Sequence, residues 1–106
     1  MKHVQFHPPT LDRIRDLKAS GADTAMLDTA VSRLRSRQKL SSRHFNGQLA
    51  AYRSAVVGTT ADGRTVAMVY RVTARTVIVD MVDEHDAAYR VMREEVQAAC
   101  KIVYLY

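Results

Sequence analysis

The spacing of apolar residues predicts the first two elements of the chain. In His3-Val4-Gln5-Phe6 every second residue is apolar, which is typical of a short, half-buried strand. Pro8-Pro9 should end that strand, because proline cannot continue a hydrogen-bonded ladder. A short helix is predicted next, capped by Thr10 and ended by Ser20-Gly21. Its apolar residues recur at helical spacing: Leu11, Ile14 and Leu17.

A second apolar stripe predicts another helix, which begins near Asp23. The stripe has helical spacing and consists of Met26, Leu27, Ala30, Val31 and Leu34. We interpret the two helices as an antiparallel hairpin. The residues from Gln38 to Asn46 follow as a polar, basic loop.

Three β-rich runs come next, namely 52–59, 66–72 and 76–82. Asp62-Gly63 is a hairpin signal, because both residues tolerate positive φ. Strands joined by such short connections form an antiparallel meander. Asp86 can cap a final helix, and the apolar end 102–106 is expected to pack as the end of that helix or as an extra strand.

This order predicts an α+β fold with the sequence β-α-α-β-β-β-(α). We expect an antiparallel sheet with the helical hairpin on one face, and the first strand at its edge or in its middle. The chain is interpreted as a single domain, 1–106, with an extra C-terminal helix or tail over 86–106.

The charge pattern favours a polyanionic partner. The chain has 16 Lys and Arg against 11 Asp and Glu, a net charge of +5. The region from Thr29 to Ala61 contains no acidic residue, whereas 80–95 is mostly acidic and is a candidate surface for a partner chain.

Other classes of protein are disfavoured. The one cysteine, Cys100, excludes an internal disulfide and a cysteine-based zinc site, and the four histidines lack metal-ligand spacing. We therefore expect no metal and no cofactor. No charged-then-apolar leader and no apolar run of about 18 residues is present, so we expect a cytoplasmic protein without membrane contact.

Three motifs stand in order along the second half of the chain. Residues 46–55 contain a Gly and then Tyr52-Arg53 at the opening of the sheet, residues 69–73 contain Tyr70-Arg71, and residues 82–89 contain His85 followed by Tyr89. With the order of elements, residues 2–89 resemble the RelE/ParE superfamily of bacterial type II toxins. The YafQ-like, RelE-like branch of mRNA interferases is the most similar.

The resemblance implies a function and partners. Most such toxins are ribosome-dependent endoribonucleases that cut mRNA during translation, and the ParE branch inhibits DNA gyrase instead. Both kinds are neutralised by a cognate antitoxin in a toxin–antitoxin hetero-oligomer. We therefore expect an endoribonuclease whose partners are the antitoxin, the ribosome and mRNA.

Cleavage by the ribose 2′-OH requires proton transfer and cations near phosphorus. His85 is the candidate acid or base, since the pKa of histidine lies near neutral pH. Tyr89 follows one helical turn later on the same face and could stack on a base. Arg53 and Arg71 lie on consecutive strands and would clamp a phosphate if both faced the open side of the sheet. Tyr52 is expected in the core.

The candidate RNA-binding residues include His44, which lies near a second active-site His of the YafQ-like branch. The others would contact phosphates without sequence preference: Arg33, Arg35, Arg37, Lys39, Arg43 and Arg64. The chain departs from the family pattern, however, at Val56, Thr65-Val66 and Ala67, where relatives carry His, Asp-Trp and Arg. Three possibilities remain open: a reduced but active nuclease, a ParE-like gyrase inhibitor, or a binding-only domain.

Overall fold

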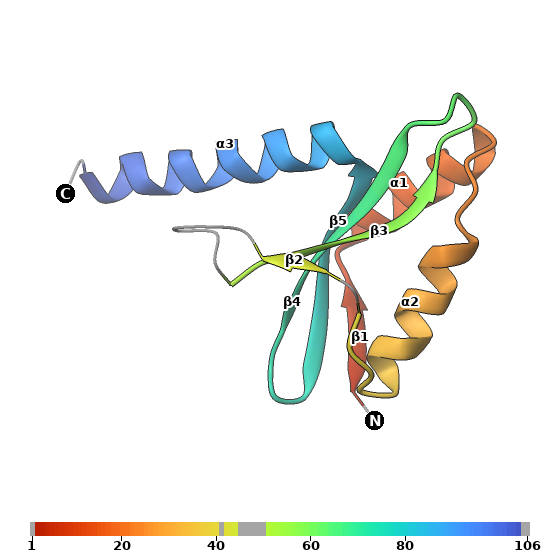
Figure 1. Ribbon diagram of the computed structural model, residues 1–106. Helices are drawn as coiled ribbons and strands as arrows, with labels where there is room; N and C mark the ends of the chain where they lie inside the picture. Colours follow the sequence, from red (N-terminus) through yellow and green to blue (C-terminus); the bar gives the residue numbers. More distant parts are fainter. Residues whose placement is uncertain (1, 41, 45–50, 105–106) are drawn as a thin grey trace.

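The computed structural model describes residues 2–40, 42–44 and 51–104, with side chains for residues 2–40, 42–43 and 51–94 (Figure 1). Its helices are α1 (Pro8–Ala19), α2 (Ala25–Arg35) and α3 (His85–Tyr104), and its strands are β1 (His3–Phe6), β2 (Arg43–His44), β3 (Arg53–Thr59), β4 (Thr65–Val72) and β5 (Thr76–Glu84). The strands form one sheet in the order β1-β5-β4-β3-β2. The predicted α+β fold is confirmed.

The sheet is mixed rather than wholly antiparallel. The meander β3-β4-β5 is antiparallel as predicted, but β1 lies at the edge and pairs in parallel with β5, from His3 beside Thr76 to Phe6 beside Val79. The chain leaves β1 through two helices before it re-enters the sheet, and strands connected through helices can run parallel. The expectation of a purely antiparallel sheet is therefore wrong for its first strand.

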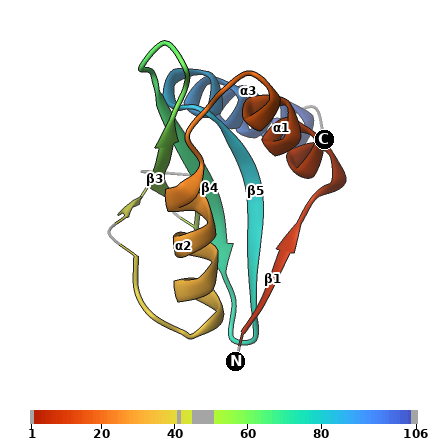
Figure 2. The ribbon, with the colours of Figure 1, turned by 90° about the vertical axis from the view of Figure 1, so that its right-hand side faces the viewer.

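Side-chain alternation along β4 gives the sheet two buried faces. Val66, Met68 and Tyr70 pack with α1 and α2 on one face, while Val69 packs with Ala88 and Met92 of α3 on the other. Figure 2 shows α1 and α2 on one side of the sheet and α3 on the opposite side. Among the described residues, the start of α3 is what packs on the second face, through Ala88 and Met92.

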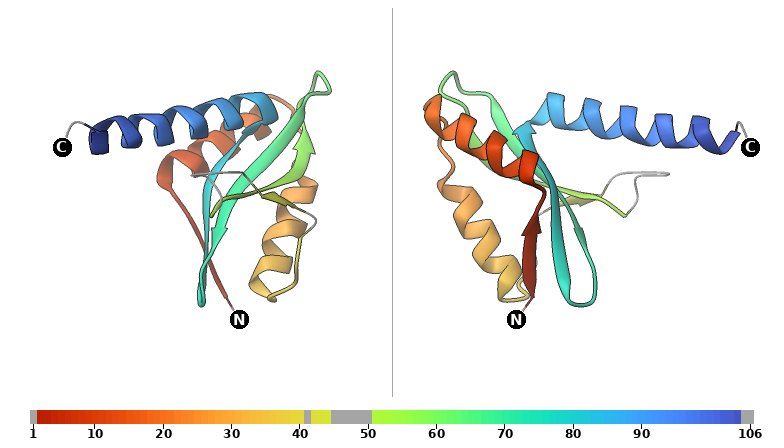
Figure 3. Two further views of the ribbon diagram at one scale, coloured as in Figure 1. Left: turned by 60° about the vertical axis from the view of Figure 1, so that its left-hand side comes forward. Right: turned by 180° about the vertical axis from the view of Figure 1, so that it is seen from behind.

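The two N-terminal helices cover one face together, but they do not pack along each other. Helix α1 lies on β5, and α2 lies on β3 and β1, so the pair forms an open V (Figure 3). The apolar sides of α1 and α2 pack in the core. The buried residues are Ile14 and Leu17 of α1 and Leu27, Ala30 and Leu34 of α2.

Helix α1 begins earlier than predicted, whereas α2 begins close to the predicted start near Asp23. Pro8 and Pro9 form the first turn of α1, where a missing N–H costs nothing. Thr10 is therefore inside the helix rather than its cap, and its hydroxyl donates to the backbone carbonyl of Asp80 at 3.1 Å. Helix α2 begins at Ala25, whose N–H donates to the Asp23 carboxylate at 3.1 Å.

A tight crossing between Asp23 and β3 joins the helices to the sheet. Asp23 and Thr59 exchange backbone hydrogen bonds of 2.8 and 3.2 Å. Gly58 lies next to this bridge, and a Cβ at Gly58 would overlap the Asp23 carbonyl oxygen. Only glycine fits there without a backbone shift.

We therefore expect Gly58→Ala to lower the free energy of unfolding by about 2 kcal/mol or more, because its methyl group would displace backbone rather than a flexible side chain. Urea unfolding measures this loss. Gly63→Ala is the control, since its Cβ meets nothing within 4 Å and only its φ of +85° is unfavourable. A smaller loss for Gly58→Ala than for Gly63→Ala would contradict the role of the crossing.

Candidate functional site

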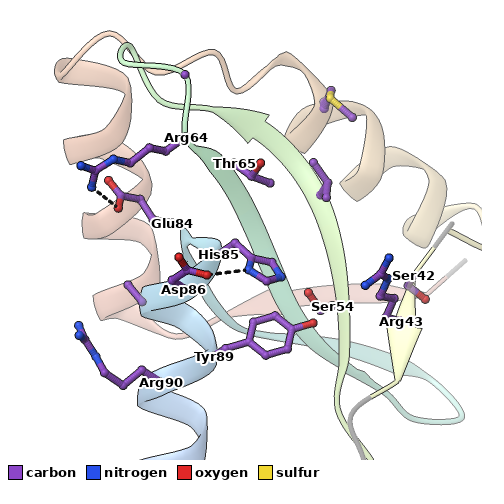
Figure 4. Close-up of a pocket in the computed structure, with 14 residues that line it drawn as sticks. Ser42, Arg43, Ser54, Arg64, Thr65, Glu84, His85, Asp86, Tyr89 and Arg90 are labelled. Atoms are coloured by element: carbon purple, nitrogen blue, oxygen red, sulfur yellow. Dashed lines mark hydrogen bonds and ion pairs between the residues drawn. The ribbon is translucent and has the colours of Figure 1, made fainter.

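An open pocket of about 1120 Å³ lies on the face of the sheet that α3 leaves uncovered (Figure 4). Its walls come from the start of α3, the end of β5, the outer part of β3 and β2. Among the residues that line it are four of the predicted site residues, His85, Tyr89, Arg43 and Arg64. The pocket therefore gathers part of the predicted site, and Arg53 and Arg71 do not line it.

His85 and Tyr89 form one wall of the pocket. Helix α3 begins at His85, directly after β5 ends at Glu84, so the register of β5 fixes the position of the imidazole. The rings of His85 and Tyr89 lie 4.4 Å apart between centroids, with a tilt of 34°. The Nδ1 atom of His85 lies 3.2 Å from the Asp86 carboxylate. An acidic partner at one ring nitrogen orients an imidazole whose other nitrogen can exchange a proton with a substrate.

Arg43 and Ser54 form the opposite wall. They are direct cross-strand partners in β2 and β3, so their side chains share a face of the sheet. In Figure 4, both lie across the pocket from His85 and Tyr89. A guanidinium opposite an imidazole can hold a phosphate while the imidazole exchanges a proton.

Two residues of this site were missed by the sequence analysis. Ser54 is uncharged and lies inside the 46–55 motif, directly after Arg53, and only its pairing with Arg43 brings it to the pocket. Arg90 follows Tyr89 on α3 and lines the pocket as an exposed cation. Arg90 lies one helical turn after Asp86, so helical geometry alone places both on the same side of α3.

Arg64 lies at the rim and is already paired with carboxylates. Its guanidinium lies 3.2 Å from Glu84 and 3.2 Å from Asp62. The hydrogen bond that Arg64 donates to Glu84 is the main cause of its raised pKa. The side chain thus links the β3–β4 turn to the end of β5, and its charge is partly balanced within the chain.

The predicted phosphate clamp of Arg53 and Arg71 does not form. Arg53 is the cross-strand partner of Tyr70, which is buried under α1 and α2, whereas Arg71 is the next residue and points to the other face. Adjacent residues of a strand face opposite sides of the sheet. The prediction was wrong because it lacked the register between β3 and β4.

Arg71 is instead held by Asp80. A bulge in β5 next to Tyr70 brings Asp80 out of the regular register. The Arg71 guanidinium donates from Nε and Nη2 to this carboxylate at 2.9 and 2.7 Å, and its pKa is raised mainly by this bidentate bond. The guanidinium also lies 5.2 Å from the centre of the Tyr52 ring. Tyr52 packs against the small core under α3, as expected of a core residue.

The acidic residues at the start of the region 80–95 are paired with basic residues of the same chain. Asp80 binds Arg71 and lies 3.2 Å from Nε2 of His7, Asp83 binds Arg13 at 2.7 Å, and Glu84 binds Arg64. Side chains that are already paired offer little charge to a partner chain.

The basic residues of α2 and the segment after it are exposed and lie apart from the pocket. They are Arg33, Arg35, Arg37 and Lys39. Arg37 has a φ of 59°, the left-handed conformation that turns the chain out of α2 toward β2. The backbone of His44, in β2, pairs with that of Arg53 in β3. The side chain of His44 is outside the described part of the chain.

The described residues contain no group of three or more His, Cys, Asp or Glu that could hold a metal ion. None of the described helices has the length and apolar character needed to cross a membrane.

Comparison with known proteins shows a RelE-like toxin fold. No protein-family model and no curated protein matches the sequence. A copper-bound mutant toxin from Helicobacter pylori matches with a TM-score of 0.67 and 18% identity, over 82% of this chain and 98% of that one. A YafQ mutant from E. coli matches with a TM-score of 0.67 and 12% identity, over 84% and 99%. A conserved hypothetical protein from Helicobacter pylori matches with a TM-score of 0.55 and 17% identity, over 81% and 97%.

We expect Arg71→Ala to lower the free energy of unfolding by about 1–3 kcal/mol, because it leaves the largely buried Asp80 carboxylate without its bidentate partner. Any activity should fall through loss of folded structure. Urea unfolding beside an activity assay separates this structural role from a catalytic one. Arg75→Ala, on the exposed turn nearby, is the control. Unchanged stability with lost activity would restore the catalytic interpretation of Arg71.

Proposed function

We propose that this chain is the toxin of a type II toxin–antitoxin system and cleaves mRNA on the ribosome. The observation that carries the proposal is the stacked pair His85 and Tyr89, which faces Arg43 across an open pocket. The RelE-like fold supports it, because it is the fold of the toxins that the chain resembles.

The pocket supports one arrangement of the reaction. The ribose 2′-OH attacks the adjacent phosphorus, and its proton passes to solvent. The bond from phosphorus to the 5′-oxygen breaks, and His85 gives that oxygen a proton. Arg43 balances the charge that develops on the phosphate, and Tyr89 stacks on a base. The products are a 2′,3′-cyclic phosphate and a 5′-hydroxyl.

Docking on the ribosome would use the exposed cations of α2 and the segment that follows it. These residues occupy part of the acid-free stretch 29–61, and the one hydrogen bond of their described side chains is weak, 3.4 Å from Arg33 to Gln38. Exposed cations bind phosphates without sequence choice.

We expect expression of the chain to slow growth and to produce new mRNA ends with 5′-hydroxyl groups. His85→Ala and Arg43→Ala should reduce cleavage by about a hundredfold or more, because each removes a group that acts at the phosphate. Mapping of transcript ends measures this reduction. Arg15→Ala, an exposed change on α1, is the control. Intact mRNA and unaffected growth with the unaltered chain would contradict the proposal.

We expect the combined change Arg35→Gln, Arg37→Gln and Lys39→Gln to weaken ribosome binding and to flatten its dependence on salt, by about one unit of slope for each phosphate that is no longer bound. Sedimentation with ribosomes at several salt concentrations measures both. Cleavage of a short free RNA, if detectable, should not change. An unchanged salt slope would place the docking surface elsewhere.

A second candidate is inhibition of DNA gyrase. Val56 favours it, because the YafQ-like branch carries a histidine at this position and valine cannot transfer a proton. Val56 is 53% exposed and lines the pocket. A supercoiling assay discriminates between the two, because a nuclease leaves gyrase active.

A further inference from the structure

Two exposed apolar side chains form a part of the pocket wall that the proposed reaction does not use. Three large apolar side chains are exposed in the described part of the chain, namely Leu11, Met26 and Val56, at 49%, 55% and 53%. Met26 and Val56 both line the large pocket, whereas Leu11 lies on α1, outside it. Single exposed apolar residues are ordinary on a protein surface, but two that meet in one pocket indicate a ligand with an apolar part.

The register of β3 places Val56 close to the position proposed for the phosphate. The pairing of β3 with β4 is regular over residues 53–56. Ser54 and Val56 are two residues apart, so their side chains share a face of the sheet and lie about 7 Å apart. Ser54 is the cross-strand partner of Arg43, and Met26 stands in the first turn of α2, which packs on β3. The apolar pair therefore adjoins the Arg43 guanidinium on the same wall.

The chemistry of this wall suits a nucleotide. Both carboxylates among the described residues that line the pocket, Glu84 and Asp86, stand at the end of β5 and the start of α3, across from β3. On the β3 side an anion meets Arg43, and an apolar group meets Met26 and Val56. A nucleotide chain presents an anionic phosphate and, next to it, the apolar face of a base, and side chains that contact such a face bind single strands.

The direction of the proposed reaction decides which base lies there. In a displacement at phosphorus, the attacking and leaving oxygens lie on opposite sides of the phosphorus atom. His85 protonates the leaving 5′-oxygen, so the nucleotide that begins with this oxygen lies on the His85 side, near Tyr89. The nucleotide that carries the attacking 2′-OH then lies on the opposite side, where Figure 4 shows Ser54 and where Val56 follows on the same face of β3.

We propose that Met26 and Val56 form a base site, which binds the base of the nucleotide that carries the attacking 2′-OH and favours a purine. Neither side chain donates a strong hydrogen bond, so selection depends on the area of ring in contact, which is larger for a purine. The thioether of Met26 also makes favourable contacts with aromatic rings. The inference rests on the proposed function, since it takes the scissile phosphate to lie between Arg43 and His85.

Binding of RNA that cannot be cleaved tests the base site apart from the reaction. The probes are two fluorescent hexanucleotides in which fluorine replaces every 2′-OH, one of six uridines and one with a single central adenosine. We expect the full chain to bind the adenosine probe about threefold or more tightly than the uridine probe. Val56→Thr, which replaces a methyl group by a hydroxyl group, and Met26→Gln should each lower this ratio at least about twofold. Leu11→Gln, the matched change of the third exposed apolar residue, should leave the ratio unchanged. Circular dichroism confirms that each variant is folded.

Equal binding of the two probes would overturn the proposal. So would a ratio that is the same for Val56→Thr and the unaltered chain, because the preference would then come from stacking on Tyr89.

The ends of cleaved transcripts separate the base site from the nuclease function. A purine should stand directly before the cut in cells, and Val56→Thr should relax this preference without changing the nucleotide after the cut. Cleavage without a preference before the cut overturns the base site and leaves the nuclease function in place. Intact mRNA, together with an adenosine preference that both pocket variants lower, overturns the nuclease function alone, and the base site stands.

Discussion

The structure depends on the burial of β4 on both of its faces. Residues 66–70 are at most 1% exposed, with side chains directed alternately into the core under α1 and α2 and into the smaller core under α3. A one-residue slip of this strand would exchange the two sets of side chains. The same register places β5 and, with it, the first residue of α3, so the packing of an apolar strand determines where the imidazole of the site stands.

The charged residues of the molecule fall into two groups with different tasks. Arg13, Arg64 and Arg71 are tied to carboxylates of β5 and stabilise the end of the sheet. Arg43 and Arg90 have no ion-pair partner among the described side chains and stand where an anion can approach. The cations that remain free to meet an anion therefore lie on the β2 and α2 side of the molecule, and the cations on the β5 side are largely neutralised within the chain.

Much of the fold could be predicted from periodicity, because α2 and the three strands of the meander each bury a regular set of side chains. The start of α1 at Pro8 was misplaced because prolines suit the first turn of a helix. The parallel pairing of β1 depends on long-range packing that no local pattern encodes. Of the site, the shared face of His85 and Tyr89 follows from helical geometry alone and was predicted, whereas the contact between their rings was not. The clamp failed because it depended on the register between two strands and on a bulge at Asp80.

The pocket combines two walls of unequal rigidity. His85 follows β5 without an intervening loop and is therefore as fixed as the sheet itself, whereas Arg43 stands on a two-residue strand at the sheet's edge. Local opening of an edge strand requires far less free energy than opening of a central one. Hydrogen exchange at β2 should therefore report changes in the width of the pocket, because the guanidinium can move while the imidazole remains in place.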